Sequence, residues 1–421
     1  MGQTIIEKIL ARAAGRDSVT PGDIVDVAVD LAVLIDTNFY PAAWREVLKV
    51  AAPEKVAVIF DHRTPAPDNR AAEAHRVGRA FVETYGIERV HDVGRDMGIA
   101  HAVIAERGYG LPGSVLVCDD SHTCAAGAFN CAAMGVGEPD MIQSVTTGRT
   151  WFRVAPTIRY ELTGILPEGV AAKDLFLWIA GLYGAHTGHN IEVGGPGLAS
   201  LGMDARRTFA TMAAELGSDF CTFEADQRLL DFMRARTDRP FTPQSPDPDA
   251  TYAELRRIDL GAVRPRVALP HSILGNTASL QEAVGEPIQQ AFIGSCANGT
   301  LDDLRMAAEV LEGRLVAPGV RLIVTPSSQA VYREALRLGY IATLMEAGAV
   351  VTNATCGACC GAHMGLLSAG ETCITSSTRN FRGRMGDPSA RIFMASSAVV
   401  AASAVAGRIA GVPVPNAEAT A

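Results

Sequence analysis

Three cysteines have the spacing needed to bind an iron–sulfur cluster. Cys296 lies in the run Ile-Gly-Ser-Cys-Ala-Asn, and Cys356 and Cys359 form a C-x-x-C within Asn-Ala-Thr-Cys-Gly-Ala-Cys-Cys-Gly. Thiolates ligate such clusters, and four of them close a 4Fe–4S cube. Three thiolates leave one iron open, so that iron can bind a substrate oxygen and act as a Lewis acid. The spacing therefore favours a catalytic 4Fe–4S cluster with three cysteine ligands, which moves water rather than electrons.

Other interpretations of these cysteines remain open from the spacing alone. A C-x-x-C is often a redox pair or half of a zinc site. Structural zinc usually has four Cys or His ligands with a second close pair, and the sequence has no second C-x-x-C and no H-x-x-x-H. A thioredoxin-like motif would follow a strand early in a small domain, whereas this one lies near the end of a long chain. Cys360 is interpreted as a packing residue, because adjacent cysteines rarely reach one cube together.

Composition argues against several classes of protein. The chain has 421 residues, more than one core usually supports, so two or three domains are expected. The net charge of −9 and the lack of a Lys/Arg-rich run argue against a nucleic-acid partner. The N-terminus carries an acid and is not a secretory signal, and the most apolar stretch, 392–406, is too short for a membrane span. Nine cysteines without small-domain spacing suit a reducing compartment, so a cytoplasmic location is expected.

Short apolar runs alternate with helix-like stretches along the chain, which indicates an α/β protein with mostly parallel sheets. Potential catalytic or ligand side chains follow five of the predicted strands. Asp-His follows 56–60, Asp-Ser-His follows 114–118, a single Cys follows 290–294, the C-x-x-C follows 349–352, and arginines follow 373–377. Ligands of open α/β sheets bind outside the carboxyl ends of the strands. These five strand ends are therefore expected to converge on one site. The predicted strands are 56–60, 114–118, 290–294, 320–325, 349–352, 373–377 and 391–396.

Three domains are expected along the chain, at 1–156, 157–285 and 286–421. Residues 301–311 are a predicted helix, because the segment is Asp-rich at its start and apolar at helical spacing. A small-residue helix is also predicted at 398–409. Residues 237–250 hold four prolines and three aspartates without an apolar period, which predicts a surface loop.

With these motifs in this order, the chain resembles the aconitase superfamily. It is most similar to the large subunits of two-subunit members such as 3-isopropylmalate dehydratase and homoaconitase, and the resemblance covers nearly the whole chain. The motifs that carry it are Asp61-His62, Leu111-Pro112-Gly113, Asp120-Ser121-His122-Thr123, Thr187-Gly188-His189 leading to Glu192, Gly294-Ser295-Cys296 with Asn298, Asp302-Asp303-Leu304-Arg305, Cys356-x-x-Cys359, and Arg379-Asn380-Phe381 with Gly383-Arg384.

The resemblance implies an aconitase-like architecture of three α/β/α domains around a 4Fe–4S cluster, closed by a fourth, swivelling domain. The sequence ends at Ala421, soon after the last predicted helix, and the swivelling domain is expected to be missing from it. In two-subunit relatives that domain is a separate small subunit, which supplies a serine base and an arginine for the substrate. The implied partners are this small subunit, in a hetero-oligomer, and a small hydroxy-carboxylate substrate.

The resemblance also implies roles for individual residues. Acid–histidine pairs would handle protons, since histidine held by a carboxylate is the usual donor near neutral pH. Arginines would bind the substrate carboxylates in bidentate fashion. One pair, Asp61–His62, is expected to protonate the departing hydroxyl. The implied residues are, for catalysis, Asp61 with His62, Asp120 with His101, and Glu192 with His122; for substrate binding, Ser121, Arg379 and Arg384; for the cofactor, Asn298; and for the cluster iron, Cys296, Cys356 and Cys359.

The implied activity is that of a hydro-lyase that dehydrates a small hydroxy di- or tricarboxylate and rehydrates the alkene, as 3-isopropylmalate dehydratase does. Asp119, Ala297, Thr378, Ala102 and the segment 35–40 depart from the biosynthetic isopropylmalate enzymes. These departures keep citraconate, maleate, 2,3-dimethylmalate and cis-homoaconitate open as substrates. Two other classes also stay open: an iron sensor that binds RNA when its cluster is lost, and a zinc-stabilised binding module.

Overall fold

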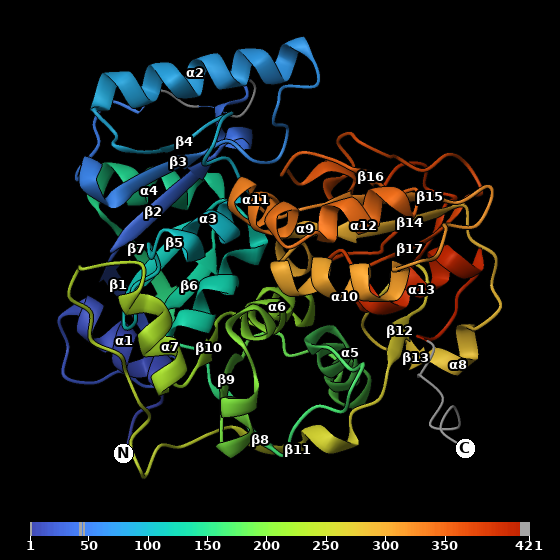
Figure 1. Cartoon of the computed structure of the whole chain (residues 1–421). Helices are drawn as coiled ribbons and strands as arrows, with labels where there is room; N and C mark the ends of the chain where they lie inside the picture. Colours follow the sequence, from blue (N-terminus) through green and yellow to red (C-terminus); the bar gives the residue numbers. More distant parts are fainter. Residues whose placement is uncertain (1, 42–43, 45–46, 413–421) are drawn as a thin grey trace.

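The computed structural model describes residues 2–41, 44 and 47–412. Its larger sheets have five, four and seven strands, and a two-stranded ribbon accompanies them. In Figure 1 the five-stranded sheet is coloured blue to cyan, the four-stranded sheet mainly green, and the seven-stranded sheet mainly orange to red. The predicted α/β fold class with mostly parallel sheets is confirmed.

The first sheet is built from residues before 150 and has helices on both faces. Its order is β4-β3-β2-β5-β6, and every pair in it is parallel. Val58 of one strand shares an apolar cluster with Phe81, whereas the next residue, Ile59, shares another with Val103. Parallel sheets are normally covered in this way on both faces. The elements of this part are β1 Ile24–Ala28, β2 Leu31–Ile35, β3 Val56–Ile59, β4 Arg89–His91, β5 Val115–Cys118, β6 Ala132–Gly135 and β7 Arg149–Arg153, helices α1 Ile5–Ala14, α2 Asn69–Tyr85, α3 Ala100–Glu106 and α4 Glu138–Thr147, and the 3-10 turns η1 Asp36–Phe39, η2 Pro53–Lys55 and η3 Ser121–Phe129.

The second sheet has the order β10-β9-β8-β11 and is parallel throughout. Its helices α5 and α6 share one core with the strands, in which Phe176 and Phe209 meet Tyr160 and Val193. The predicted loop is confirmed, because residues 237–249 contain no helix or strand. The elements are β8 Thr157–Thr163, β9 Asn190–Gly194, β10 Cys221–Phe223 and β11 Glu254–Asp259, with α5 Ala172–Tyr183, α6 Met203–Ala213, α7 Gln227–Arg234, η4 Pro196–Ser200, η5 Ala214–Leu216 and η6 Leu260–Ala262.

The third sheet has the order β13-β12-β18-β17-β14-β15-β16, parallel except at β12. Across the first and third sheets, the seven predicted strands agree with the observed ones to within two residues at each end. The helix predicted at 301–311 matches α10 at both ends. The elements are β12 Arg266–Ala268, β13 Thr277–Ser279, β14 Gln290–Gly294, β15 Arg321–Thr325, β16 Val350–Val351, β17 Thr372–Thr375 and β18 Arg391–Met394, with α8 Leu280–Ala283, α9 Ser295–Asn298, α10 Leu301–Leu311, α11 Gln329–Arg337, α12 Tyr340–Glu346, α13 Ser397–Ala406 and η7 Gly357–Cys360.

The domain ranges 1–156, 157–285 and 286–421 stay a prediction, and one observation bears on the second boundary. Strands β12 and β13 precede residue 286, yet β12 pairs with β18 at the edge of the third sheet. Sheet pairing therefore groups residues 266–279 with the third domain rather than the second.

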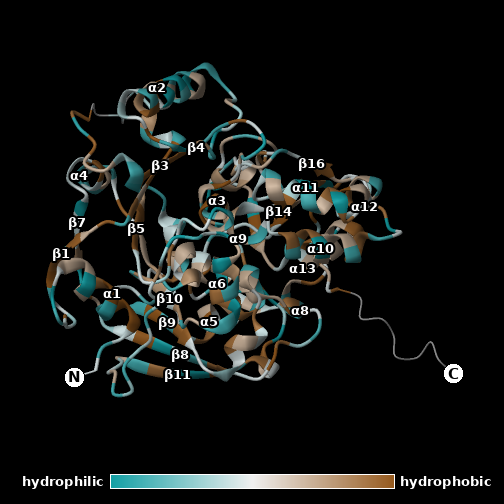
Figure 2. Ribbon diagram, turned by 60° about the vertical axis from the view of Figure 1, so that its left-hand side comes forward, coloured by the Kyte–Doolittle hydropathy of each residue, from teal (hydrophilic) through white to brown (hydrophobic). Residues whose placement is uncertain are grey.

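Hydrophobic residues concentrate in the strands and on the inner sides of the helices. Figure 2 shows brown, hydrophobic stretches along β3 and β5, while α2 carries teal, hydrophilic positions as well. Among the described residues, no helix combines the length and the apolar character that a bilayer crossing requires.

Candidate active site

A cavity of about 250 Å³ collects the polar side chains that follow the strands. Its walls come from the loops after β3, β5, β14, β16 and β17, together with α3 and the loop before it. The predicted convergence of five strand ends is therefore seen in the structure. The lining residues are His62, Ile99, His101, Asp120, His122, Cys296, Cys356, Cys359, Cys360, Thr378, Arg379 and Arg384.

Three buried cysteines share this cavity, with exposed fractions of 6% for Cys296, 8% for Cys356 and 4% for Cys359. Cys296 lies in the short helix that directly follows β14. Cys356 immediately precedes the η7 turn, and Cys359 lies within that turn. Cys360 lines the same cavity and packs against the apolar cluster that contains Cys296 and Cys356, and its Sγ donates to the carbonyl of Gly357 at 3.3 Å. Three thiols that face one enclosed space are the donor set of an iron–sulfur cluster, so the residues present fit that cofactor.

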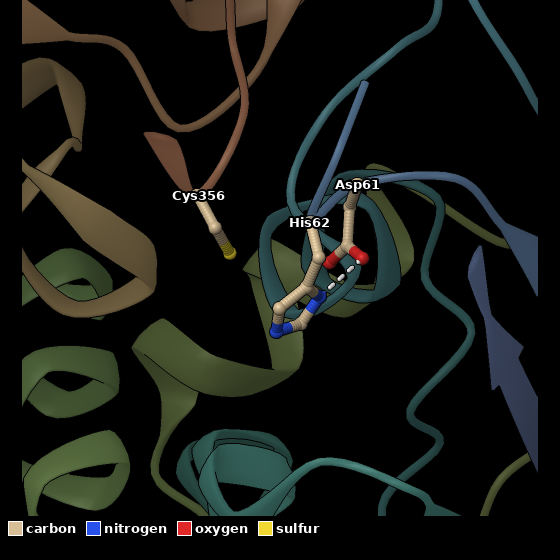
Figure 3. Close-up of side chains that lie close together, drawn as sticks. All are labelled: Asp61, His62 and Cys356. Atoms are coloured by element: carbon tan, nitrogen blue, oxygen red, sulfur yellow. Dashed lines mark hydrogen bonds and ion pairs between the residues drawn. The ribbon is translucent and has the colours of Figure 1, made fainter. Parts of the chain in front are cut away.

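His62 is held between two carboxylates. Its Nδ1 lies 2.8 Å from Asp61 Oδ1, and its Nε2 lies 3.2 Å from Asp120 Oδ2. Figure 3 shows the first contact, with Asp61 and Cys356 on opposite sides of His62; ligand-capable atoms of these three residues lie within 4.8 Å of one another. Burial disfavours the charged ring, but Asp61 and Asp120 outweigh it and raise the pKa of His62 well above its usual value. His62 therefore carries a proton at neutral pH.

Asp120 joins three histidines into one network. Its Oδ2 meets His62, and its Oδ1 lies 2.9 Å from His101 Nε2. The same Oδ1 accepts the backbone N–H of His122 at 2.7 Å. Burial alone would raise the pKa of Asp120, but the three histidines outweigh it and hold that pKa well below its usual value. The predicted contacts Asp61–His62 and Asp120–His101 are thus confirmed as contacts.

The predicted contact between Glu192 and His122 is wrong. Glu192 is fully buried on β9, where its Oε1 accepts from Arg159 Nη1 at 2.8 Å and from the Tyr252 hydroxyl at 2.6 Å. Its Oε2 accepts the backbone N–H of Ile5 at 2.8 Å. The reason is the direction of the side chain on β9, which points to the start of α1 and away from the cavity. Glu192 anchors the N-terminal helix.

Glu215 occupies the place expected for Glu192. It stands on η5, directly after α6, with its Oε1 2.9 Å from His122 Nε2 and 2.7 Å from Arg379 Nε. Burial raises the pKa of Glu215, but His122 and Arg379 outweigh it and lower that pKa. Burial opposes a charged His122, yet Cys296, Asp120 and Glu215 together raise its pKa well above the usual value. No strand-end signal marks Glu215 in the sequence, because it follows a helix.

Two of the predicted substrate-binding residues, Arg379 and Arg384, line the same cavity, and Ser121 contacts the first of them. Arg379 Nη2 donates to Ser121 Oγ at 2.7 Å, and the arginine side chain keeps 24% of its surface exposed. Arg384 lines the cavity, and its Nε has no hydrogen-bond partner within the described part of the chain. A buried donor of this kind can be satisfied by a bound anion. Asn298 is buried and donates to Asp303 Oδ1 at 2.9 Å.

Comparison with known proteins gives the family of this chain. Residues 46–287 and 274–407 match the model described as the aconitase family (aconitate hydratase). The chain belongs to the aconitase family. A 3-isopropylmalate dehydratase large subunit of Mycolicibacterium smegmatis is 55% identical to it over 97% of this chain and 96% of that protein.

Two further relatives and one solved structure match over similar lengths. A probable 3-isopropylmalate dehydratase large subunit of Methanothermobacter thermautotrophicus is 42% identical over 97% of this chain and 98% of its own length. A probable methanogen homoaconitase large subunit from the same organism is 43% identical over 96% of both. The crystal structure of Thermococcus kodakaraensis aconitase X in its holo-form covers 91% of each chain at a TM-score of 0.49 and 13% identity.

Lys173 is a second residue at this aconitase-family site that sequence reasoning missed. It is fully buried on α5, in the second sheet's layer, and its Nζ donates to the carbonyl of Ser377 at 3.0 Å. Burial lowers the pKa of Lys173 to about 8, although Asp303 and other groups oppose this. Ser377 precedes Thr378, whose Oγ1 lies 3.6 Å from Cys359 Sγ. Lys173 therefore ties the cavity-lining turn after β17 to the second sheet's layer.

Proposed function

We propose that this chain is the cluster-binding large subunit of a hydro-lyase that removes and adds water at a small hydroxy di- or tricarboxylate. The observation that carries this reaction class is the single cavity lined both by three buried thiols and by three histidines bonded to acids. The most similar relative quoted above is named for 3-isopropylmalate, so that is the first substrate to test. Homoaconitate chemistry is the second, because a homoaconitase large subunit is 43% identical.

Cys296, Cys356 and Cys359 would hold a 4Fe–4S cluster in this proposal, with Asn298 beside it. When bound, such a cluster supplies a Lewis-acidic iron for the oxygens of the substrate. Cys360 also lines the cavity, but we leave it out of the ligand set, because adjacent cysteines rarely reach one cube together and its Sγ already donates to the carbonyl of Gly357. A reducing, cytoplasmic location would suit the cofactor and stays a prediction.

The chain's own side chains would then handle protons and carboxylates. Asp61 and Asp120 fix His62 and raise its pKa, so it is suited to protonate the departing hydroxyl. His122, fixed by Glu215, is suited to hold a second proton near the site. Arg379, with Ser121, and Arg384 would bind the substrate carboxylates, because a guanidinium pairs with carboxylate in bidentate geometry.

A small subunit would complete the site. The relatives named above are large subunits, which implies a partner for each of them. In this proposal His62 and His122, each held by a carboxylate, act as the acids of the site. Removal of a substrate C–H proton needs a base, which we assign to the partner.

The proposal is tested by co-expressing the chain with its small-subunit partner and reconstituting the complex anaerobically with iron and sulfide. Hydration of isopropylmaleate, cis-homoaconitate, citraconate, maleate and cis-aconitate is followed by the loss of alkene absorbance. We expect isopropylmaleate to be the best substrate and the isolated chain to be nearly inactive. Hydration of none of the five, or robust turnover by the chain alone, would refute the proposal. Salt-dependent RNA binding by the metal-free chain would instead favour an iron sensor.

Arg379→Lys is expected to lower kcat/KM by about 10- to 100-fold, mainly through KM, since a hydrogen bond to a charged group contributes about 1.5–3 kcal/mol. Lysine keeps the charge but cannot donate both to Ser121 and to a carboxylate in a fixed fork. Arg382→Lys is the matched control, because Arg382 lies exposed in the same loop. Steady-state kinetics of both variants decide the matter: equal effects at the two positions would remove Arg379 from the substrate site.

A further inference from the structure

The loop after β2 stands between the two turns that carry the acid–histidine contacts. In the first sheet, β2 pairs in parallel with β3 on one side and with β5 on the other. The carboxyl ends of these three strands are therefore neighbours. β3 leads into Asp61 and His62, and β5 leads into Asp119 and Asp120. The η1 turn follows β2 and so lies between the two.

Asp36, the first residue of η1, holds the turn after β3. Its side chain is fully buried, and its Oδ1 accepts the backbone N–H groups of Asp61 at 3.2 Å and His62 at 2.9 Å. Its Oδ2 accepts the N–H of Arg63 at 2.8 Å. A carboxylate offers only acceptors and so matches three converging donors. His75 Nε2 lies 3.7 Å from the same Oδ2.

Asn38, two residues later, holds the turn after β5. Its Oδ1 accepts the N–H of Ile35 at 2.8 Å, which fixes the orientation of the amide. Its Nδ2 then donates to Asp119 Oδ2 at 2.7 Å. Asp119 precedes Asp120, whose Oδ2 meets His62 Nε2 at 3.2 Å. One hydrogen bond thus joins the turn after β2 to the turn after β5.

We infer that Asp36 and Asn38 are positioning residues, which set the approach of His62 to Asp120 from the strand between them. The inference rests on the proposed function, because that function gives the acid–histidine network its catalytic meaning. Neither residue is among the described residues that line the cavity, so both act through the turns they hold. Geometry of this kind matters, because a displacement of about 1 Å can cost about 100-fold in rate.

A swap of the two side chains tests the inference in the reconstituted complex. Asn38→Asp keeps the acceptor for Ile35 but sets a carboxylate against Asp119, which Asp120 and Glu138 also face. We expect kcat to fall about tenfold with KM nearly unchanged, a coupling typical of residues in contact. The double variant Asn38→Asp/Asp119→Asn restores a donor–acceptor pair in reverse and should recover most of kcat. Asp119→Asn alone keeps an acceptor for Asn38 and is the matched control.

A second readout separates this inference from the proposed function. Crystal structures of the variants should show the His62 Nε2–Asp120 Oδ2 distance lengthened in Asn38→Asp and restored in the double variant, whether or not any alkene is hydrated. Iron content and circular dichroism should match the wild type. Asp36→Asn replaces one carboxylate oxygen with an amide donor that faces backbone N–H groups, so it should also lower kcat. If this variant does not fold, the Asn38 and Asp119 variants provide the test. An unchanged distance in Asn38→Asp, or no recovery in the double variant, would overturn the inference.

Discussion

Cys356→Ser is expected to lose both the cluster and turnover, with kcat lower by about three orders of magnitude or more, since a Lewis-acid metal contributes several kcal/mol to the transition state. The physical reason is the donor: iron–sulfur clusters are held by thiolates, and a serine hydroxyl at this position stays protonated at neutral pH. The measurement is iron and acid-labile sulfide per chain, together with alkene hydration by the reconstituted complex.

Cys360→Ser is the control that makes the first experiment specific. Cys360 lines the same cavity and follows Cys359 directly, but its sulfur donates to Gly357 O at 3.3 Å. A serine hydroxyl can make the same contact, so iron content and kcat should stay within about threefold of the wild type. Full activity of Cys356→Ser, or loss of iron from Cys360→Ser, would contradict the proposed ligand set.

Strands of the first and third sheets could be predicted because most of them are buried on both faces, whereas none of the strands of the second sheet was predicted. The segment Gln290–Gly294 is buried throughout, and in the sequence it is a short apolar run bounded by residues that interrupt secondary structure. Helix α10, which follows the short helix α9, begins at a recognisable cap, where Thr300 and Asp303 exchange side-chain to backbone hydrogen bonds. Local signals of this kind fix where elements begin and end.

The strand-end residues of the site could be predicted for a related reason. Parallel strands bring their carboxyl ends to one edge of a sheet, so His62 and Asp120 had to approach each other once β3 and β5 flanked β2. Their 3.2 Å contact follows from topology, with the detail set by the loops.

Other features of the fold and of the site depend on packing between segments that are distant in the sequence, and no local sequence pattern predicts such packing. Glu215 reaches His122 because α6 packs closely against η3, the turn that bears His122. Strand β12 joins the third sheet through the pairing of Ala268 with Met394. In both cases the partner is far away in the chain, and a helix end or a short strand gives no indication of which partner it will meet.

Glu215→Gln and Glu192→Gln form a matched pair that tests the correction directly. Glu215→Gln removes the charge that fixes His122, and we expect kcat to fall about 100-fold, within the range that one general acid–base group contributes. Glu192 lies outside the cavity and accepts from Arg159, Tyr252 and Ile5. Its variant should keep kcat but lower the free energy of unfolding by about 1–3 kcal/mol, because a buried charged hydrogen bond is weakened.

Kinetics and denaturant unfolding on the same two preparations separate these effects. The substitutions are chemically identical, and the side chains of Glu215 and Glu192 are only 13% and 0% exposed, so a general loss of packing would lower stability in both variants. A catalytic role for Glu215 requires the activity loss to appear in Glu215→Gln and the larger stability loss to appear in Glu192→Gln. The reverse pattern would return Glu192 to the catalytic set and leave Glu215 as a structural partner of Arg379.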